Sequence, residues 1–410
     1  MRRLLRLLIP LAALAAFLPP AAAAQDIHSA NMSLVFSAPN GSGAINSDIA
    51  FWGNRAYYGD YDGFRIFDIS DPSAPTLLSD FTCVGPQNDP VVWQNRLLLL
   101  AVDRTMTGPQ CGATPTAQHG DPNGWEGVRI FDVSNPAAPS QIGAVYTDCG
   151  AHTITLHPAP AAGILHLYVS SYPLRPGPTC GTVNGPRVGR DPLHGVIQVL
   201  EVPLSNPAGT HEVAEPKIVY PGDPDNKFNW FEHGLAPVPG AIEPSARACH
   251  DISVYVPLNL AVAACAEQAQ AWRIRPNGIP DTEHPLWVVD DRADTNGATG
   301  NPADQEVAVD FWHSATMSWD GKIVNFIDES FGEGCPTETE ITEPGAAGMA
   351  DTGRMFFYRR TGARLSHFQI PRPEMPPAGV PNYCSAHLGN VVPAIGRYLL
   401  ANAWYTGGVD

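Results

Sequence analysis

The sequence predicts an all-β chain folded as a β-propeller of four-stranded antiparallel blades, and three observations lead to this fold class. A thirteen-residue segment recurs almost unchanged, short alternating strands follow one another along the chain, and turn-forming residues are abundant. The 410 residues include 41 prolines and 38 glycines, which is typical of turn-rich β structure. Because 44% of the residues are hydrophobic, the chain can also form a packed core.

The repeated segment defines the blade. Residues 63–75 read GFRIFDISDPSAP and residues 127–139 read GVRIFDVSNPAAP. Each copy predicts one strand with alternating side chains, an Asp/Asn-Pro turn and a following strand. Two further strands precede each copy, so one unit supplies the four strands of a propeller blade.

Weaker copies of this unit extend the pattern to the end of the chain. The units are predicted to start near residues 45, 88, 151, 249, 311 and 386. The fourth strand of the third unit is predicted at residues 217–220. In the sixth unit only two strands are predicted before residues 407–410, so this unit looks truncated and a ring of six or seven blades is expected. Residues 32–37 are a candidate for an outer strand that closes the ring.

The N-terminal residues indicate export. Arg2, Arg3 and Arg6 precede an apolar run at residues 7–18, and three alanines then offer a cleavage site, so residues 1–24 are predicted to be a signal peptide. Residues 25–410 would form a single propeller domain that is secreted and extracellular. No later stretch approaches the ~20 apolar residues of a membrane span. The formal net charge of −17 argues against nucleic acid as a partner.

Eight cysteines in an exported chain indicate disulfide bonds, although spacing alone leaves the pairing open. The two ends of an antiparallel hairpin lie at the same edge of a sheet, so cysteines that flank one hairpin can meet. This rule predicts three bonds within blades and a fourth between neighbouring blades: Cys83 with Cys111, Cys149 with Cys180, Cys249 with Cys265, and Cys335 with Cys384. A metal held by cysteines would need close Cys-x-x-Cys pairs, which the sequence lacks.

Alignment of the first strand of each unit predicts a ring of polar side chains in the central channel, because the innermost strand of every blade lines it. The aligned residues are Asp48, Asp89, His152, His250, His313 and His387. Imidazole and carboxylate groups suit Cu, Zn, Fe or Mn, so a transition-metal site with three or four of these ligands is predicted. The alternative is that each histidine only bonds to a neighbouring blade and fills the channel.

Two glutamates are expected at the same face as this ring. Glu329 and Glu267 each follow the second strand of a unit, and either could act as an acid or base there. Exposed carboxylates on the rim are the alternative interpretation of both residues.

The segments 66–70 (IFDIS) and 130–134 (IFDVS) resemble the LVIVD-repeat family of exported bacterial β-propellers, in which Ile/Val-x-Asp-Ile/Val-Ser precedes an Asp/Asn-Pro turn. The resemblance implies a propeller from about residue 45 onward and no particular activity. In architecture alone, the histidine ring is similar to that of the copper-dependent methanethiol oxidases, also called selenium-binding proteins. That second resemblance implies a channel metal.

Two functions remain open from the sequence, and it does not decide whether the protein is an enzyme. In the first, the channel metal serves oxidation or hydrolysis of a small molecule. In the second, a non-catalytic module binds a surface protein or glycan through the long loops at residues 172–193 and 291–309. No nucleotide cofactor is expected, because the sequence has no phosphate loop or dinucleotide fingerprint. An open blade edge would also allow a homodimer.

Overall fold

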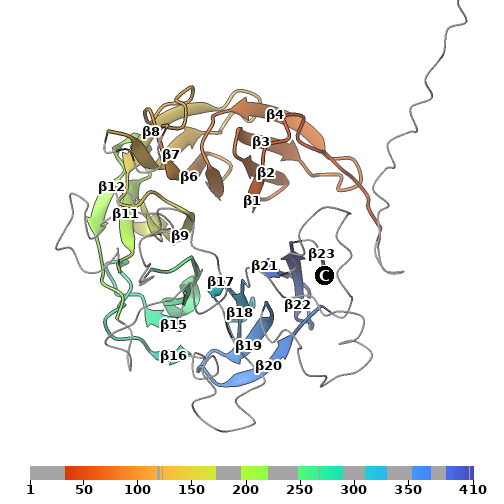
Figure 1. The fold of residues 1–410 in the computed structure, drawn as a ribbon, viewed down its shortest axis with the longest axis vertical. Coiled ribbons are helices and arrows are strands. Elements are labelled where there is room, and N and C mark those ends of the chain that lie inside the picture. Colours follow the sequence, from red (N-terminus) through yellow and green to blue (C-terminus); the bar gives the residue numbers. More distant parts are fainter. Residues whose placement is uncertain are drawn as a thin grey trace, which may run out of the picture.

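The computed structural model describes residues 33–117, 121, 123–171, 195–219, 248–266, 268–289, 309, 311–329, 353–370, 385–405 and 407–410. Within these residues, six antiparallel sheets stand around one central axis, with the lowest-numbered strand of each sheet nearest that axis (Figure 1). The predicted β-propeller is therefore confirmed. No helix in the described part of the chain is long and apolar enough to cross a membrane.

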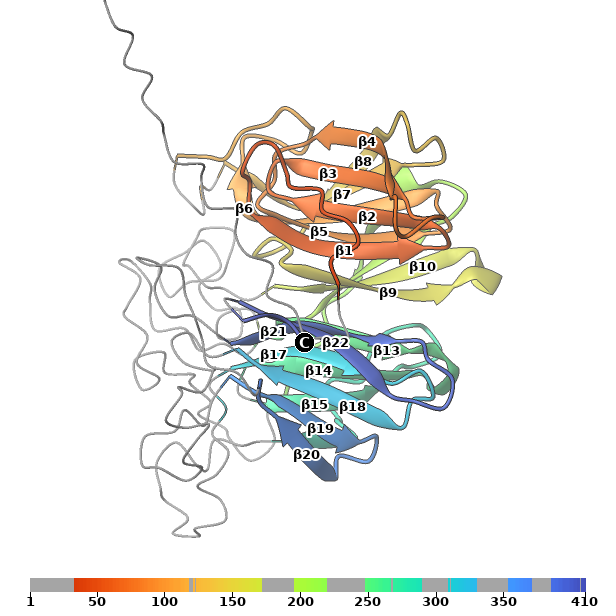
Figure 2. The ribbon, with the colours of Figure 1, turned by 90° about the vertical axis from the view of Figure 1, so that its right-hand side faces the viewer.

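The first three blades follow the order of the sequence from the axis outward (Figures 1 and 2). Blade one contains β1 (Asn46–Trp52), β2 (Arg55–Asp60), β3 (Gly63–Asp68) and β4 (Thr76–Thr82). Blade two contains β5 (Gln87–Trp93), β6 (Leu97–Met106), β7 (Trp125–Asp132) and β8 (Ser140–Tyr146). Blade three contains β9 (Thr153–Ala159), β10 (Ile164–Ser170), β11 (Gln198–Pro203) and β12 (His211–Ala214).

The remaining blades repeat the arrangement. Blade four contains β13 (Asp251–Tyr255), β14 (Leu260–Cys265), β15 (Gln268–Arg273) and β16 (Trp287–Val289). Blade five contains β17 (Trp312–Met317), β18 (Ile323–Asp328), β19 (Met355–Arg359) and β20 (Arg364–Phe368). Blade six has three strands, β21 (Ala386–Val392), β22 (Leu399–Trp404) and the two-residue β23 (Gly408–Val409).

Three details differ from the sequence prediction. The fourth strand of blade three is β12, whereas Lys217 makes only an isolated bridge to Val196. The sixth blade does have a third strand, because β23 pairs with β22 at the C-terminal residues. Residues 33–37 form no strand; Phe36 instead packs edge-on against Phe67 of β3. Residue 32 lies outside the described residues.

The repeated segment is explained by its turn and by a close backbone approach. Asp68 and Asp132 end β3 and β7, and each carboxylate accepts the backbone N–H two residues later at 2.8 Å. Gly63 begins β3 with a φ of 156°, where a Cβ would lie 2.0 Å from the Phe81 carbonyl oxygen. Gly127 takes the same place in blade two. A side chain at either position would clash with the outer strand.

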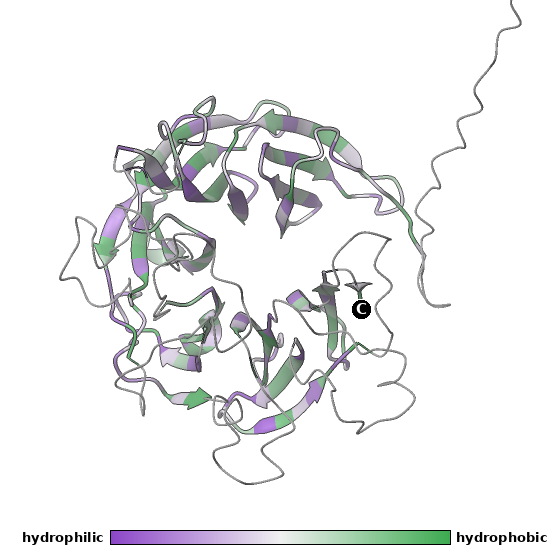
Figure 3. Cartoon of the chain, in the orientation of Figure 1, coloured by the Kyte–Doolittle hydropathy of each residue, from purple (hydrophilic) through white to green (hydrophobic). Residues whose placement is uncertain are grey.

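The hydrophobic core lies between the blades, and each two blades that follow one another along the chain share a separate cluster of side chains. Between blades one and two, for example, Tyr57 and Phe64 pack against Leu98 and Phe131. Trp312 of β17 packs among Phe326, Phe356 and residues of blade four such as Val262. Five clusters of this kind join consecutive blades, and together they fix the innermost strands around the channel. Figure 3 shows the green, hydrophobic positions along these strands.

Candidate metal centre

The four predicted histidines form one continuous arc at the start of the inner strands of blades three to six. The ring centroids of His152 and His250 are 4.6 Å apart, those of His250 and His313 are 3.6 Å apart, and those of His313 and His387 are 4.5 Å apart. Side chains separated by more than 200 residues in the sequence thus become neighbours at the channel. The propeller topology causes this, since every inner strand starts at the same end of the ring.

Hydrogen bonds between adjacent inner strands hold this arc in place. The Thr153 hydroxyl of β9 donates to the His250 carbonyl oxygen, and the Ser314 hydroxyl of β17 donates to the His387 carbonyl oxygen at 2.8 Å. One step further along the same strands, Thr316 donates to the Gly389 carbonyl oxygen at 2.7 Å. The backbone that carries His250 and His387 is therefore held by the preceding blade.

The two predicted aspartates lie one position beyond the histidine register. Asp89 accepts the Ile154 N–H at 2.9 Å, just as Asp251 accepts the Ala315 N–H at 3.1 Å. Asp89 therefore corresponds to Asp251, and Asn88 takes the place of a histidine in blade two. The inner strands of blades one, two and six share one pairing irregularity, between Asn46 and Ile49, between Gln87 and Pro90, and between Ala386 and Gly389. Counted from it, Asp48 and Asp89 stand one position after His387. An inserted residue of this kind is not visible in a sequence alignment.

Asp48, Asp89 and Asp251 form an acidic group in the channel. Burial raises the pKa of Asp48. Burial, together with the charge of Asp48, holds the pKa of Asp89 well above its usual value. Burial also raises the pKa of Asp251 to about 6. Neighbouring carboxylates disfavour each other's ionised form, so these groups favour the protonated state more than isolated carboxyl groups do.

In the histidine arc, burial lowers the pKa values instead of raising them. Burial, with the neighbouring imidazoles, holds the pKa values of His250 and His313 well below the usual value. Burial and the proximity of His152 lower the pKa of His387 to about 4. These imidazoles are therefore neutral at pH 7, which is the form that binds a metal ion.

Glu329 joins the arc from the end of β18. Its Oε2 lies 3.3 Å from His313 Nε2, and its Oε1 accepts a hydrogen bond from the Tyr405 hydroxyl. Only 4% of Glu329 is exposed, so the interpretation as a rim carboxylate is wrong for this residue. Glu267 lies outside the described residues.

His313, Glu329 and His387 each offer a ligand atom, and these atoms all lie within 4.8 Å of one another. Ligands on one ion are held at bond lengths of about 2.0–2.2 Å, which places them roughly 3–4 Å from each other. Within the described part of the chain, this is the one group of three such side chains. The donor set therefore fits a transition metal, with small closing movements of the side chains.

The proton on His313 can be assigned from its neighbours. Nδ1 lies 2.6 Å from the Ser314 hydroxyl oxygen and 3.2 Å from the His387 carbonyl oxygen. The Ser314 hydroxyl already donates its hydrogen to that carbonyl, so the proton between Nδ1 and these oxygens belongs to Nδ1. Nε2 then presents a lone pair to the Glu329 carboxylate. A cation between these two acceptors would stabilise the arrangement.

His152, at the other end of the arc, forms a dyad with Asp103, which is not among the predicted site residues. Its Nδ1 lies 2.7 Å from Asp103 Oδ2, and its Nε2 lies 3.1 Å from the Gln87 amide nitrogen. Because the amide nitrogen can only donate, Nε2 accepts and Nδ1–H points to the carboxylate. His152 is half-buried, so it can be reached from the channel. Asp103 could have been selected as the polar residue that follows the apolar run 97–102.

The disulfide bonds follow the predicted rule where the structure describes both partners. Cys83 is bonded to Cys111, and Cys249 is bonded to Cys265. Cys149 also forms a disulfide bond. Three cysteines of the predicted pairs lie outside the described residues, namely Cys180, Cys335 and Cys384. Disulfide bonds are consistent with an exported protein, whereas the signal peptide stays a prediction.

Two solved structures are similar to the chain at low sequence identity. The chain is similar to the periplasmic gluconolactonase PpgL of Pseudomonas aeruginosa, with 12% identity over 84% of this chain and 73% of that chain, and a TM-score of 0.45. It is also similar to Sqt1 of Saccharomyces cerevisiae, with 7% identity over 87% of this chain and 80% of that chain, and a TM-score of 0.42. At these values the similarity says nothing about activity. No curated protein sequence matches the chain.

A family model for the LVIVD repeat matches residues 44–83 and 123–147. These segments cover the strands of blade one and the outer strands of blade two, including both copies of the thirteen-residue segment. The chain therefore contains LVIVD repeats in the first two of its six blades.

Proposed function

We propose that this propeller binds one divalent transition ion, Cu, Zn, Fe or Mn, through His313, His387 and Glu329, and acts on a small molecule in its channel. The observation that carries the proposal is the convergence of three ligand atoms within 4.8 Å on neutral imidazoles and a buried carboxylate. All three residues come from rigid strands of blades five and six or from their ends. Sites built on such elements hold their geometry well.

Two imidazoles and one carboxylate form a donor set known from catalytic zinc and non-haem iron sites, which keep coordination positions open. An ion bound there would supply a Lewis acid and lower the pKa of water. The chain supplies the orientation. Tyr405 fixes the Glu329 carboxylate, and the Nδ1–H of His313 keeps Nε2 free to coordinate.

The His152–Asp103 dyad gives the channel a base. Asp103 fixes the tautomer of His152, whose Nε2 can take a proton from water or from a substrate once the Gln87 amide is displaced. The His250 ring lies between this dyad and His313, so both groups face the same part of the channel. A base beside a metal centre favours hydrolysis of a small molecule over its oxidation.

Metal analysis of the chelator-stripped, reloaded protein tests the proposal. We expect one ion per chain, and we expect Glu329→Gln to weaken binding by at least about a hundredfold, because it removes a charged ligand but keeps the shape and the bond from Tyr405. His284→Ala is the matched control, since His284 is an exposed histidine in the connection between β15 and β16 of blade four. A wild-type protein that binds no stoichiometric ion, or a Glu329→Gln variant that binds equally well, would contradict the proposal.

A loop deletion distinguishes the metal site from the alternative, a non-catalytic binding module. Its loops at residues 172–193, and at 291–309 apart from residue 309, lie outside the described residues. A protein that binds a glycan or surface protein without metal, and loses this binding when residues 172–193 are deleted, would be such a module.

A further inference from the structure

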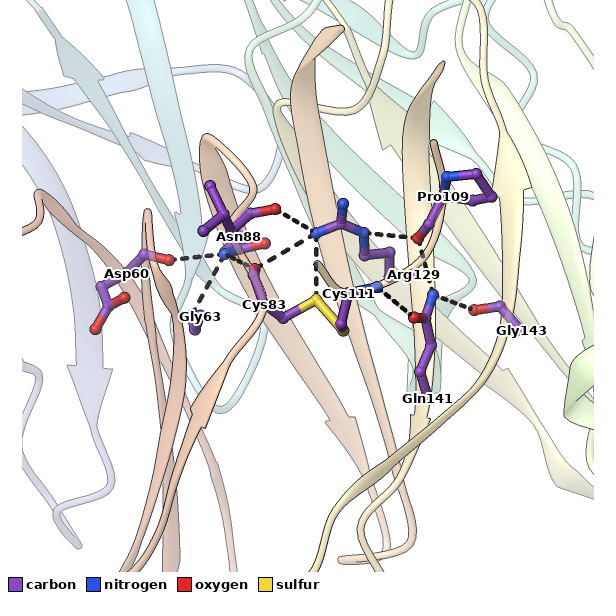
Figure 4. Close-up of a disulfide and its surroundings, with 10 residues drawn as sticks. Asp60, Gly63, Cys83, Asn88, Pro109, Cys111, Arg129, Gln141 and Gly143 are labelled. Atoms are coloured by element: carbon purple, nitrogen blue, oxygen red, sulfur yellow. Dashed lines mark hydrogen bonds between the residues drawn. A yellow bond between two sulfur atoms is a disulfide. The ribbon is translucent and has the colours of Figure 1, made fainter. Parts of the chain in front are cut away.

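A buried guanidinium lies against one of the disulfide bonds. Cys83 follows β4, Cys111 belongs to the connection between β6 and β7, and Arg129 comes from β7 (Figure 4). The Arg129 side chain is fully buried, and its Nη1 lies 3.3 Å from Cys83 Sγ. The cation and the sulfur are therefore in direct contact.

The other partners of Arg129 are neutral. Nη1 donates to the Val84 carbonyl oxygen at 2.7 Å and to the Cys83 carbonyl oxygen at 3.4 Å, and Nε donates to the Pro109 carbonyl oxygen at 2.9 Å. Among the described residues Arg129 makes no ion pair, and its Nη2 is buried without a hydrogen-bond partner. Burial lowers the pKa of Arg129 to about 10, so the group remains a cation at neutral pH.

A buried cation without a counter-charge is costly, and a thiolate at Cys83 would supply that charge. Opening the disulfide bond would thus turn a neutral contact into an N–H···S⁻ pair. A pair of this kind stabilises the reduced form and lowers the pKa of the leaving thiol. In the structure, Arg129 favours Cys83 as the thiolate.

Exposure determines which sulfur can be attacked. Cys83 is fully buried, whereas Cys111 is half-buried and belongs to a loop. Gln141 accepts the Cys111 N–H at 2.8 Å and so fixes this loop on β8 (Figure 4). In the Cys249–Cys265 bond both residues are buried, so neither sulfur is open to attack. The two disulfide bonds therefore differ in access.

We propose that Cys83–Cys111 is a thiol–disulfide exchange site whose partner is a dithiol. A thiolate of the dithiol attacks Cys111 Sγ, the S–S bond breaks, and its electron pair leaves on Cys83 Sγ as a thiolate beside Arg129. The second thiol of the partner then attacks its own sulfur in the mixed disulfide and releases Cys111. The partner is oxidised to its disulfide by two electrons, and the protein gains two thiols, one of them ionised. This site is independent of the metal centre.

Reduction of the full mature chain by dithiothreitol, followed by alkylation and peptide mass spectrometry, tests the proposal. We expect Cys83–Cys111 to be reduced at least about tenfold faster than Cys249–Cys265. Arg129→Gln should lower the reduction rate of Cys83–Cys111 at least about tenfold. Arg129→Lys, which retains a charge, should keep most of the wild-type rate. Equal rates for the two bonds, or no effect of Arg129→Gln in a folded variant, would overturn the proposal.

A measurement on the unmodified chain keeps the test decisive if these variants fail to fold. Thiolate absorbance of the selectively reduced protein should titrate with a midpoint below about 7, against about 8.5 for an ordinary cysteine. A midpoint at or above the ordinary value would show that Arg129 does not stabilise a Cys83 thiolate.

Discussion

Blades one and two carry the repeated segment, whereas blades five and six carry the candidate metal ligands. The first two blades carry both copies of the repeated segment, and neither contributes a histidine to the arc, since Asn88 takes that place in blade two. Blades five and six have only faint copies of the segment, yet they provide His313, His387 and Glu329. The repeat stabilises turns and packing on outer strands, whereas the chemistry lies on inner strands. The strength of a repeat is thus no guide to the position of a functional site.

The largest expected effect tests whether the repeat is purely structural. Phe131 is fully buried in blade two and lies edge-on to Phe64 and Phe81. Phe131→Ala should lower the free energy of unfolding by about 3–5 kcal/mol, measured by urea denaturation, with unchanged metal content in the folded protein. Phe51→Ala, at a 56% exposed position, should cost less than about 1 kcal/mol. Loss of metal in folded Phe131→Ala would contradict this separation.

The two kinds of channel residue should give opposite pH dependence in the metal-free protein. The pKa of His387 is lowered from 6.5 to about 4, so its contribution to stability is present above pH 6.5 and is lost as the pH falls toward 4. The pKa of Asp251 is raised from 3.8 to about 6, so its contribution is present below pH 3.8 and is lost as the pH rises through 6. Each effect amounts to roughly 3 kcal/mol.

Both transitions fall between about pH 4 and pH 6.5, so the two contributions oppose each other there, and denaturation curves from pH 4 to pH 8 separate them in variants. Over this window, His387→Gln should make the stability fall more steeply with rising pH, and Asp251→Asn, which can still accept the Ala315 N–H, should make it rise more steeply. If both variants keep the wild-type pH profile, the burial of these groups does not control their protonation.

The smallest expected effect tests the hydrogen bond that supports the proposed metal ligand Glu329. Tyr405→Phe removes the donor to Glu329 without changing the shape of the ring, and we expect metal affinity to fall about tenfold to a hundredfold, or about 1.4–2.7 kcal/mol. Titration against a competing chelator measures this change. Tyr398→Phe is the control, because this hydroxyl bonds to exposed Asp320 instead. An unchanged affinity for Tyr405→Phe would show that Glu329 needs no such support.

The fold could be predicted because the repeat fixes the length and order of the strands. The outer strand of blade three was misplaced for a physical reason: β12 (His211–Ala214) is largely exposed and polar, whereas the apolar run 218–219 looked more like a strand. Outer strands bury little surface, so hydrophobicity does not mark them.

The sequence predicts only part of the candidate site. The four histidines were found because they occupy one register position, and the structure brings them together. The sequence does not distinguish Glu329 from Glu267, because the burial of Glu329 depends on Tyr405 and on strands distant in the sequence. The register of Asp48 and Asp89 could not be found, since an irregular strand pairing leaves no mark in the residue types.

The two blades that share the proposed ion are also the last two along the chain. Blade six is the smallest, and it is joined to blade five by the bonds from Ser314 and Thr316 and by the Trp319 indole, which donates to the Val391 carbonyl oxygen at 2.9 Å. An ion bound by residues of both blades would hold blade six against blade five. Metal loading would then slow the local opening of residues 385–410 and protect them from proteases, so a fold-stabilising role would accompany any chemistry.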